Sequence, residues 1–327
     1  MCHCYVSLTV KDDSQKLIGD VKSTDDVSRF LPNLCYIVDD LNLYSVHIQV
    51  FGLKADRMAK QPLANRAWTL AKHPQFFWWC GHCIVLFCTS FYFWYWITFS
   101  SSEGVIFYHG AYFGAMLSYG VVIYKSFGKW RTPRLNWEYF QKINKDENVF
   151  YFLLAFMWFM STPVFVTLVP YATFSLFHFI TYFRTNILQT FFPPPHPSGP
   201  PGAQNEWVNK TSKYIQTWVH NNYDQAMKIV SFVEVVVITS FLLLNILTFQ
   251  LAIIIFFSYC IFLRMRYHMN PYTREVFDNV TQFLDRKIFG NPNVPPLLIK
   301  AYQHTKSAVI WFGNNNQSNI PQGSRRG

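Results

Sequence analysis

Residues 229–263 read IVSFVEVVVITSFLLLNILTFQLAIIIFFSYCIFL and contain one acid, Glu234, and no Lys or Arg. As one straight α-helix these roughly 35 residues would be about 52 Å long at 1.5 Å per residue. The hydrocarbon core of a bilayer is only about 30 Å thick. Asn245 and Gln250 lie near the middle of the run, where a turn can satisfy its own polar groups. The run therefore predicts a membrane segment that bends and is followed by a basic segment from Arg264.

The composition places the protein in the membrane class. Of its 327 residues, 51% are hydrophobic, 19% are aromatic and only 14% are charged, whereas soluble globular domains carry about 25% charged residues. The charges gather at the ends and in connecting segments, between three long stretches that almost lack them. We therefore predict an all-α integral membrane protein with four to six membrane helices arranged as helical hairpins, followed by C-terminal amphipathic helices.

The balance of 28 basic and 18 acidic residues gives a formal charge of +10. The Lys and Arg residues lie beside apolar runs, where such residues commonly set membrane orientation and contact lipid headgroups. We therefore expect membrane lipids, and no nucleic acid, among the partners. The seven cysteines do not form a secreted disulfide framework, and we interpret them mainly as small buried apolar residues.

The first two membrane segments are predicted to form a hairpin. Residues 76–99 are long enough to span a bilayer, and residues 105–124 return across it after a short connector over 100–103. Four glycines offer a small-residue seam for close helix packing, namely Gly104, Gly110, Gly114 and Gly120.

The distribution of basic residues predicts the orientation in the membrane. The loop 125–148 contains six Lys or Arg residues, whereas the connector 100–103 contains none. By the positive-inside rule, the loop and the segment before the first membrane helix are cytosolic and the connector is luminal. We expect both termini to be cytosolic.

Residues 149–183 form a second long run without a formal charge, interrupted by Pro163 and Pro170. Because proline removes a helix hydrogen bond, we favour two short arms that meet near these prolines. The flanking charges, Lys145 and Arg184, then lie on the same cytosolic side. One tilted, kinked span is the alternative, and the number of full crossings stays open between four and six.

The other segments complete the predicted domain organisation. Residues 1–57 are an N-terminal extension that is either disordered or not natively translated, with Met58 as the alternative start. Residues 58–183 hold the first membrane hairpins with the basic cytosolic loop 125–148, and residues 184–228 hold a Pro-rich linker and an interfacial helix over 206–227. The last membrane hairpin covers 229–263, the basic junction and amphipathic helices cover 264–312, and residues 313–327 form a disordered tail.

Two amphipathic helices are predicted after the last membrane run. The first carries apolar residues at helical spacing, namely Val276, Val280, Phe283, Leu284 and Ile288. The second follows the break at 292–296 and carries Leu298, Ala301, Tyr302, Thr305, Val309 and Phe312, with Lys300, His304 and Lys306 facing away. We expect these helices to contact the membrane surface or a partner, or to cap the bundle, and we favour membrane contact for the second because its polar face is basic.

Residues 79–83 read WCGHC, the letters of a disulfide-isomerase active site. That chemistry needs a thiol of lowered pKa at a helix N-terminus on a thioredoxin-type βαβ unit, whereas this motif is embedded in an apolar run. The intramembrane candidates His82, His109, His178 and Glu234 show no histidine-box or zinc-protease spacing. We therefore predict no catalytic residue, no metal and no cofactor, and a protein that is not an enzyme.

Two motifs resemble those of a known family. Residues 262–277, FLRMRYHMNPYTREVF, resemble the segment after the last apolar run in the transmembrane protein 33 family, and residues 77–82, FWWCGH, are similar to the opening of the first membrane segment in its fungal members. The resemblance covers roughly residues 58–312. The positions that match the family pattern are Gly81, His82, Arg266, Tyr267, Asn270, Pro271, Tyr272, Arg274 and Phe277. The extension 1–57 and the insert 193–201 have no counterpart, which leaves their roles open.

The resemblance implies a membrane protein of the endoplasmic reticulum and nuclear envelope that shapes membrane and supports nuclear pore organisation. It also implies reticulon-type proteins, nucleoporins and a nuclear import receptor as partners. The residues suggest how such shaping works, because arms of about 16 residues reach only about 24 Å and would widen one leaflet. The alternatives are a transporter or channel, and a membrane oxidoreductase that uses Cys80 and Cys83.

Overall fold

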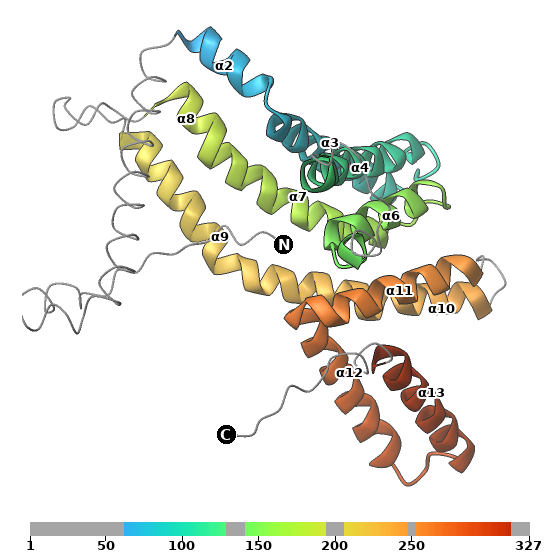
Figure 1. Cartoon of the computed structure of the whole chain (residues 1–327). Coiled ribbons are helices and arrows are strands. Elements are labelled where there is room, and N and C mark those ends of the chain that lie inside the picture. Colours follow the sequence, from blue (N-terminus) through green and yellow to red (C-terminus); the bar gives the residue numbers. More distant parts are fainter. Residues whose placement is uncertain (1–61, 129–140, 194–205, 248–252, 315–327) are drawn as a thin grey trace, which may run out of the picture. The chain divides into compact units, whose positions relative to one another are not determined.

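A computed structural model describes residues 62–128, 141–193, 206–247 and 253–314 (Figure 1). These residues form helices and contain no strand, which confirms the all-α prediction. The helices are α2 (Leu63–Ala71), α3 (Pro74–Ile97), α4 (Val105–Phe127), α6 (Glu147–Phe159), the 3₁₀ turn η1 (Phe165–Thr167), α7 (Leu168–Tyr182), the π-helical η2 (Phe183–Ile187), α8 (Leu188–Phe191), α9 (Glu206–Phe232), the π-helical η3 (Val233–Ile238), α10 (Thr239–Leu247), α11 (Ile253–Met269), α12 (Pro271–Phe289) and α13 (Pro296–Asn314).

The chain divides into two compact units. In the described part of the first unit, Phe192 packs edge-on against Trp207 with ring centroids 6.1 Å apart, and Leu188 and Val208 are buried. The second unit covers Ala71–Phe183 and Lys213–Gly327 and holds most of the apolar helices. The predicted extension 1–57, the Pro-rich insert and most of the tail lie outside the described residues.

Four helical stretches of the described chain are long and apolar enough to cross a membrane: Pro74–Ile97, Val105–Phe127, Phe165–Phe191 and Glu206–Leu247. The first two are α3 and α4, as predicted. Pro74 stands at the first position of α3, where its missing N–H leaves no hydrogen bond unmade. The preceding His73 caps the helix by accepting a hydrogen bond from the backbone N–H of Gln75 at 3.2 Å.

The α3–α4 pair crosses closely at two glycines. A Cβ added to Gly81 would lie 2.7 Å from the carbonyl oxygen of Gly114, and a Cβ added to Gly114 would lie 2.7 Å from that of Gly81. Gly110 packs against Cys88 of α3 in the same seam. Gly120 does not belong to it, because a Cβ there would meet only Phe152 of α6, at 3.6 Å.

The run 149–183 forms two helices, which confirms the two-arm prediction. Helix α6 ends at Phe159, and Pro163 lies in the non-helical gap before η1. Pro170 lies in the first turn of α7, where a helix tolerates proline. The second arm is longer than predicted, because the helical stretch continues to Phe191.

Ring contacts show that α6 and α7 run antiparallel to their neighbours. Tyr151 near the start of α6 stacks on Tyr119 of α4 with centroids 5.6 Å apart, and Phe159 at its end lies 5.2 Å from His109, near the start of α4. Trp79 near the start of α3 stacks on Phe179 near the end of α7. The starts of α3 and α6 and the ends of α4 and α7 therefore lie at one end of the bundle.

The last apolar run forms two helices, α10 and α11, on either side of residues 248–252. Figure 1 shows α10 and α11 side by side. The predicted bend falls on residues 248–252, which lie outside the described part. The interfacial helix predicted over 206–227 is not separate, because α9, η3 and α10 form one continuous helical stretch from Glu206 to Leu247. That stretch contains no Gly or Pro to break it.

The core of the second unit is rich in tyrosine. Tyr112 donates a hydrogen bond to Thr167 Oγ1 at 2.6 Å, and Tyr171 donates to the backbone oxygen of Tyr151 at 2.9 Å. A hydroxyl in an apolar medium needs such a partner, because no water is there to replace it. These bonds cross between helices and therefore fix how the helices pack.

Candidate functional site

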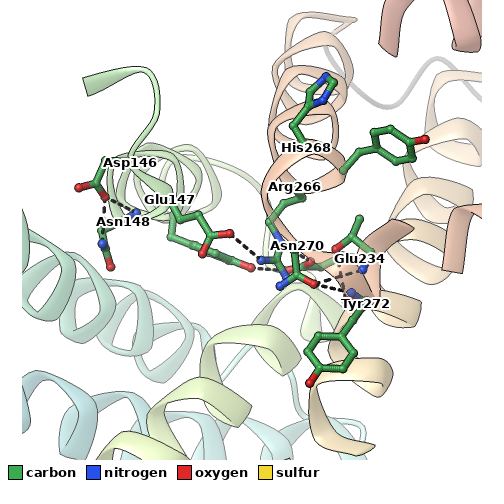
Figure 2. Close-up of polar contacts among 12 residues, drawn as sticks. Asp146, Glu147, Asn148, Glu234, Arg266, His268, Asn270 and Tyr272 are labelled. Carbon is green, nitrogen blue, oxygen red and sulfur yellow. Dashed lines mark hydrogen bonds and ion pairs between the residues drawn. The ribbon is translucent and has the colours of Figure 1, made fainter. Parts of the chain in front are cut away.

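The most unusual feature of the described core is a buried ion-pair cluster. Arg266 of α11 lies between two carboxylates: its Nε donates to Glu234 Oε2 of η3 at 3.1 Å, and its Nη1 donates to Glu147 Oε1 of α6 at 3.4 Å. The exposed fractions of these side chains are 1% for Arg266, 2% for Glu234 and 9% for Glu147. Figure 2 shows Arg266 reaching from its helix toward both carboxylates. One arginine thus joins three helical segments that are far apart in the sequence.

Tyrosines complete the hydrogen bonding around this cluster. Tyr151 donates its phenolic O–H to Glu234 Oε1 at 2.7 Å, and Tyr259 donates to the backbone oxygen of Glu234 at 2.8 Å. The Tyr151 ring also lies 5.5 Å from the guanidinium carbon of Arg266. A buried charge is tolerated only when it is paired and hydrogen-bonded, and both conditions hold here.

The family-pattern residues after Arg266 form the turn between α11 and α12. Asn270 is the N-cap of α12: its Oδ1 accepts hydrogen bonds from the backbone N–H groups of Tyr272 at 2.9 Å and Thr273 at 3.2 Å. Pro271 follows as the first helical residue, which suits its fixed φ. Arg274 reaches back to the last turn of α11 and donates to the carbonyl oxygen of His268 at 3.0 Å. The motif therefore ends one helix and starts the next.

Two aromatic residues of the motif hold this turn in place. The Tyr267 ring packs edge-on against Phe277 with centroids 5.5 Å apart. Tyr272 donates to Asp224 Oδ1 of α9 at 2.6 Å, and this hydrogen bond raises the pKa of Tyr272 to about 12. Lys228 of α9 adds an ion pair to Glu275 at 2.9 Å. The start of α12 is thus tied to α9 as well as to α11.

The other family-pattern pair, Gly81 and His82, lies on α3 away from this turn. Gly81 makes the close crossing with α4 described above. His82 is buried, and its Nδ1 lies 2.9 Å from Ser175 Oγ of α7. Its ring packs against those of Trp78 and His178, with centroids 4.7 and 4.8 Å away. These residues therefore fasten α3 to α4 and α7.

The predicted amphipathic helices form α12 and α13, and Asp285 joins them. Asp285 accepts hydrogen bonds from Tyr302 at 2.7 Å and from Lys306 Nζ at 2.7 and 2.9 Å. Hydrogen bonds from Lys306 and Tyr302 lower the pKa of Asp285, and burial together with Asp285 raises the pKa of Tyr302 to about 12. The prediction that Lys306 faces away from the Tyr302 side was wrong, because residues four apart share a helix face.

The remaining surface candidates differ in how far the structure covers them. On α12, Val280 packs against the core, Leu284 and Ile288 are partly buried, and Phe283 is 54% exposed. On α13, Leu298, Val309 and the neighbouring Trp311 are 54–67% exposed, and Lys300 is exposed. Phe312 lies under Arg264, 5.1 Å from its guanidinium carbon. The start of α12 therefore caps the bundle, whereas α13 keeps an uncovered apolar surface.

Sequence reasoning singled out Glu234 and Arg266 but did not pair them with Glu147 or Tyr151. A lone acid in an uncharged run was the available signal, because such an acid needs a basic partner. Among the described residues, no group of three or more His, Cys, Asp or Glu could hold a metal. Cys80 and Cys83 are free thiols in the second and third turns of α3, away from its N-terminus.

Comparison with known proteins decides the family. The profile described as Transmembrane protein 33/Nucleoporin POM33 matches residues 59–314. The chain belongs to this family. Its relatives include Nucleoporin POM33 of Chaetomium thermophilum, 30% identical over 261 residues that cover 78% of this chain and 91% of the relative. Tetra-spanning protein 1 of Schizosaccharomyces pombe is 30% identical over 77% of this chain and 89% of its own length.

Pore membrane protein of 33 kDa of Saccharomyces cerevisiae is a further relative, 27% identical over 81% of this chain and 92% of its own. No solved structure matches the chain. The matched residues 59–314 include the buried cluster, the α11–α12 turn and both C-terminal helices, so these features lie within the part of the chain that the family shares.

Proposed function

We propose that this protein is a non-enzymatic membrane protein of the endoplasmic reticulum and nuclear envelope that stabilises curved membrane and supports nuclear pore organisation. The names of its relatives, a nucleoporin, a pore membrane protein and a tetra-spanning protein, support the location. Both termini are then cytosolic, as the basic loop 125–148 predicts.

The observation that supports the shaping mechanism is the shortness of the last hairpin. From Glu234 to Leu247 and from Ile253 to Arg266, each arm is only about 20 Å long at 1.5 Å per residue. With the charged base of the hairpin at the edge of the membrane, arms of this length are shorter than a hydrocarbon core about 30 Å thick. Such a hairpin widens one leaflet more than the other and acts as a wedge.

The second part of the mechanism is the surface of α13. Its exposed Leu297, Leu298 and Val309 share one face of the helix and are suited to the interface on the same side as the hairpin base. Insertion of these side chains would widen the same leaflet further. Nucleoporins, reticulon-type proteins and a nuclear import receptor are the proposed partners, which would concentrate this wedge at pores or tubules.

The transporter alternative requires polar groups that remain available along a path. In the described core the buried charged side chains instead bond to one another, as Arg266 does with both carboxylates, and Tyr112 bonds to Thr167. This arrangement favours a scaffold over a transport route.

The test is reconstitution of the purified protein in liposomes at increasing protein-to-lipid ratios, with vesicle shape recorded by electron cryomicroscopy. We expect tubules or smaller vesicles at high ratios. A matched variant with Leu297 and Leu298 changed to Ser should act more weakly, because it removes two exposed apolar anchors of α13 and no core contact. Unchanged vesicle shape at every ratio with the native protein would reject the wedge.

A further inference from the structure

The last long helical stretch changes from α to π geometry at its buried acid. Between α9 and α10, the six residues of η3, Val233–Ile238, form a π-helix, and Glu234 is the second of them. A π turn closes i→i+5 hydrogen bonds and is one residue wider than an α turn; such turns are rare and often mark functional sites. An α-helix would be the ordinary continuation of α9, so contacts around η3 hold the wider turn.

Side chains from α11 hold this turn through Glu234. Arg266 donates to its carboxylate at 3.1 Å, and the hydroxyl of Tyr259 donates to its backbone carbonyl oxygen at 2.8 Å. The hydroxyl of Thr239 donates to the same carbonyl oxygen at 3.2 Å. In an α-helix the backbone N–H four residues on would point at this oxygen, whereas π geometry opens it to the two hydroxyls. The wide turn therefore depends on Arg266 and Tyr259.

Burial along the stretch shows what the extra residue does. Val230, Glu234, Ile238 and Leu242 follow one another at intervals of four and are at most 2% exposed. In a plain α-helix each step of four residues turns the face by about 40°, so Leu242 would lie about 120° around the helix from Val230. The wider turn of η3 removes about one residue's rotation, about 100°, and keeps both residues on the buried side.

The sequence of α10 is compatible with a second register. If η3 closed to an α-helix, α10 would turn by about 100°, and Val237 and Phe241 would take the places of Ile238 and Leu242. Val237 and Phe241 are apolar and already partly buried. Helix α10 contains no charged residue, so the rotation would carry no charge into the lipid.

We propose that η3 is a register switch for the last hairpin, locked in its π form by the bonds from Arg266 and Tyr259 to Glu234. When these bonds are released, η3 closes to an α-helix and turns α10 by one residue position, so that the hairpin presents a different face to the surrounding lipid. The bond from Arg266 to Glu147 does not involve η3 (Figure 2), so α11 stays on α6 while α10 turns. The switch does not depend on the wedge, because both registers keep the hairpin in the membrane.

Nitroxide scanning of positions 237–244 in the full-length protein tests the switch. Labels are attached to single cysteines in a protein whose native cysteines are changed to Ala, and accessibility to dissolved oxygen is measured in phosphatidylcholine nanodiscs. Oxygen reaches lipid-facing labels and not buried ones, so we expect minima at positions 238 and 242. Glu234→Gln together with Tyr259→Phe should move the minima to 237 and 241. Gln can still accept from Tyr151, which donates to Glu234 in the native protein, so this double variant leaves that buried hydroxyl its partner.

Two further variants separate release of the switch from damage to the fold. Deleting Val236 removes the extra residue, so in the double variant it should return the minima to positions 238 and 242, in native numbers. Glu147→Gln is the matched control, because it takes the other carboxylate from Arg266 but no bond from η3, and its minima should stay at 238 and 242.

The outcomes that would overturn the proposal are distinct. They are minima that remain at 238 and 242 in the double variant, a scan without periodicity, and a deletion that does not restore the native positions. Failure of the double variant to fold both with and without the deletion would overturn it as well.

Discussion

Replacing Arg266 tests the central packing of this protein. Arg266→Met replaces the guanidinium with an unbranched apolar side chain. The substitution leaves Glu234 and Glu147 buried without their cation. Removing one partner of a buried ion pair costs about 3–5 kcal/mol, because the remaining charge is uncompensated. We therefore expect the hairpin α10–α11 to detach from α6, and the protein to unfold at a clearly lower temperature.

The assay is thermal unfolding of the purified protein in mild detergent, followed by tryptophan fluorescence. Trp158 serves as a reporter, because it is buried and lies 6.1 Å from the ring of Tyr259 on α11. Exposed Lys287→Met is the matched control, since it removes a charge on α12 that pairs with no carboxylate in the described contacts. Its unfolding temperature should stay near that of the native protein.

A compensating variant separates charge from shape. Changing Arg266 to Met together with Glu147 and Glu234 to Gln removes all three charges, and replacing a whole buried ion cluster by neutral groups is often nearly neutral. This triple variant should regain much of the lost stability. If Arg266→Met alone is as stable as the native protein, the cluster does not hold the hairpin and the reasoning is refuted.

Three further perturbations follow from the described contacts. Asn270→Ala should destabilise the start of α12 by about 1 kcal/mol, because the N-cap is lost. Asn270→Ser should largely retain the stability of the native protein, because serine can also cap the helix. The measurement is amide hydrogen exchange, which should be faster at the start of α12 in Asn270→Ala. Gly81→Ala should cost roughly 1–3 kcal/mol through overpacking against α4, whereas Gly120→Ala should change the unfolding temperature little. Docking of α13 should weaken as pH falls below about 4: the folded pKa of Asp285 is depressed, so its stabilisation is present above the unfolded value of about 3.9 and lost on protonation. Asp285→Asn should loosen α13 at pH 7 as well, and equal protection of α13 in amide exchange at pH 7 and at about pH 2, well below the unfolded pKa of about 3.9, would contradict this.

Much of the helical framework could be predicted from local sequence. The apolar runs, the short polar connector 100–103 and the prolines of the second run indicate where α3, α4, α6 and α7 begin and end, because hydropathy and helix breaking act over a few residues. The turn between α11 and α12 is equally local: Asn270 caps and Pro271 starts the next helix. Two boundaries were missed. The second arm continued past residue 183 to Phe191, and no Gly or Pro marks a boundary between 206–227 and the last run, so the helix continued through it.

The packing of the candidate sites could not be predicted from local sequence. The sequence marks Glu234 and Arg266 for separate reasons, and only the folded bundle brings Arg266 to Glu234 and, across 119 residues of chain, to Glu147. Likewise, Gly114 and Gly120 belong to one predicted seam, yet Gly114 meets α3 whereas Gly120 faces Phe152 of α6. The sequence by itself determined an all-α membrane protein of paired helices, because hydrophobic burial and helix capping are local. The tertiary structure alone decided which charges pair and which face of α13 docks, because these depend on the rotation of each helix against neighbours distant in the chain.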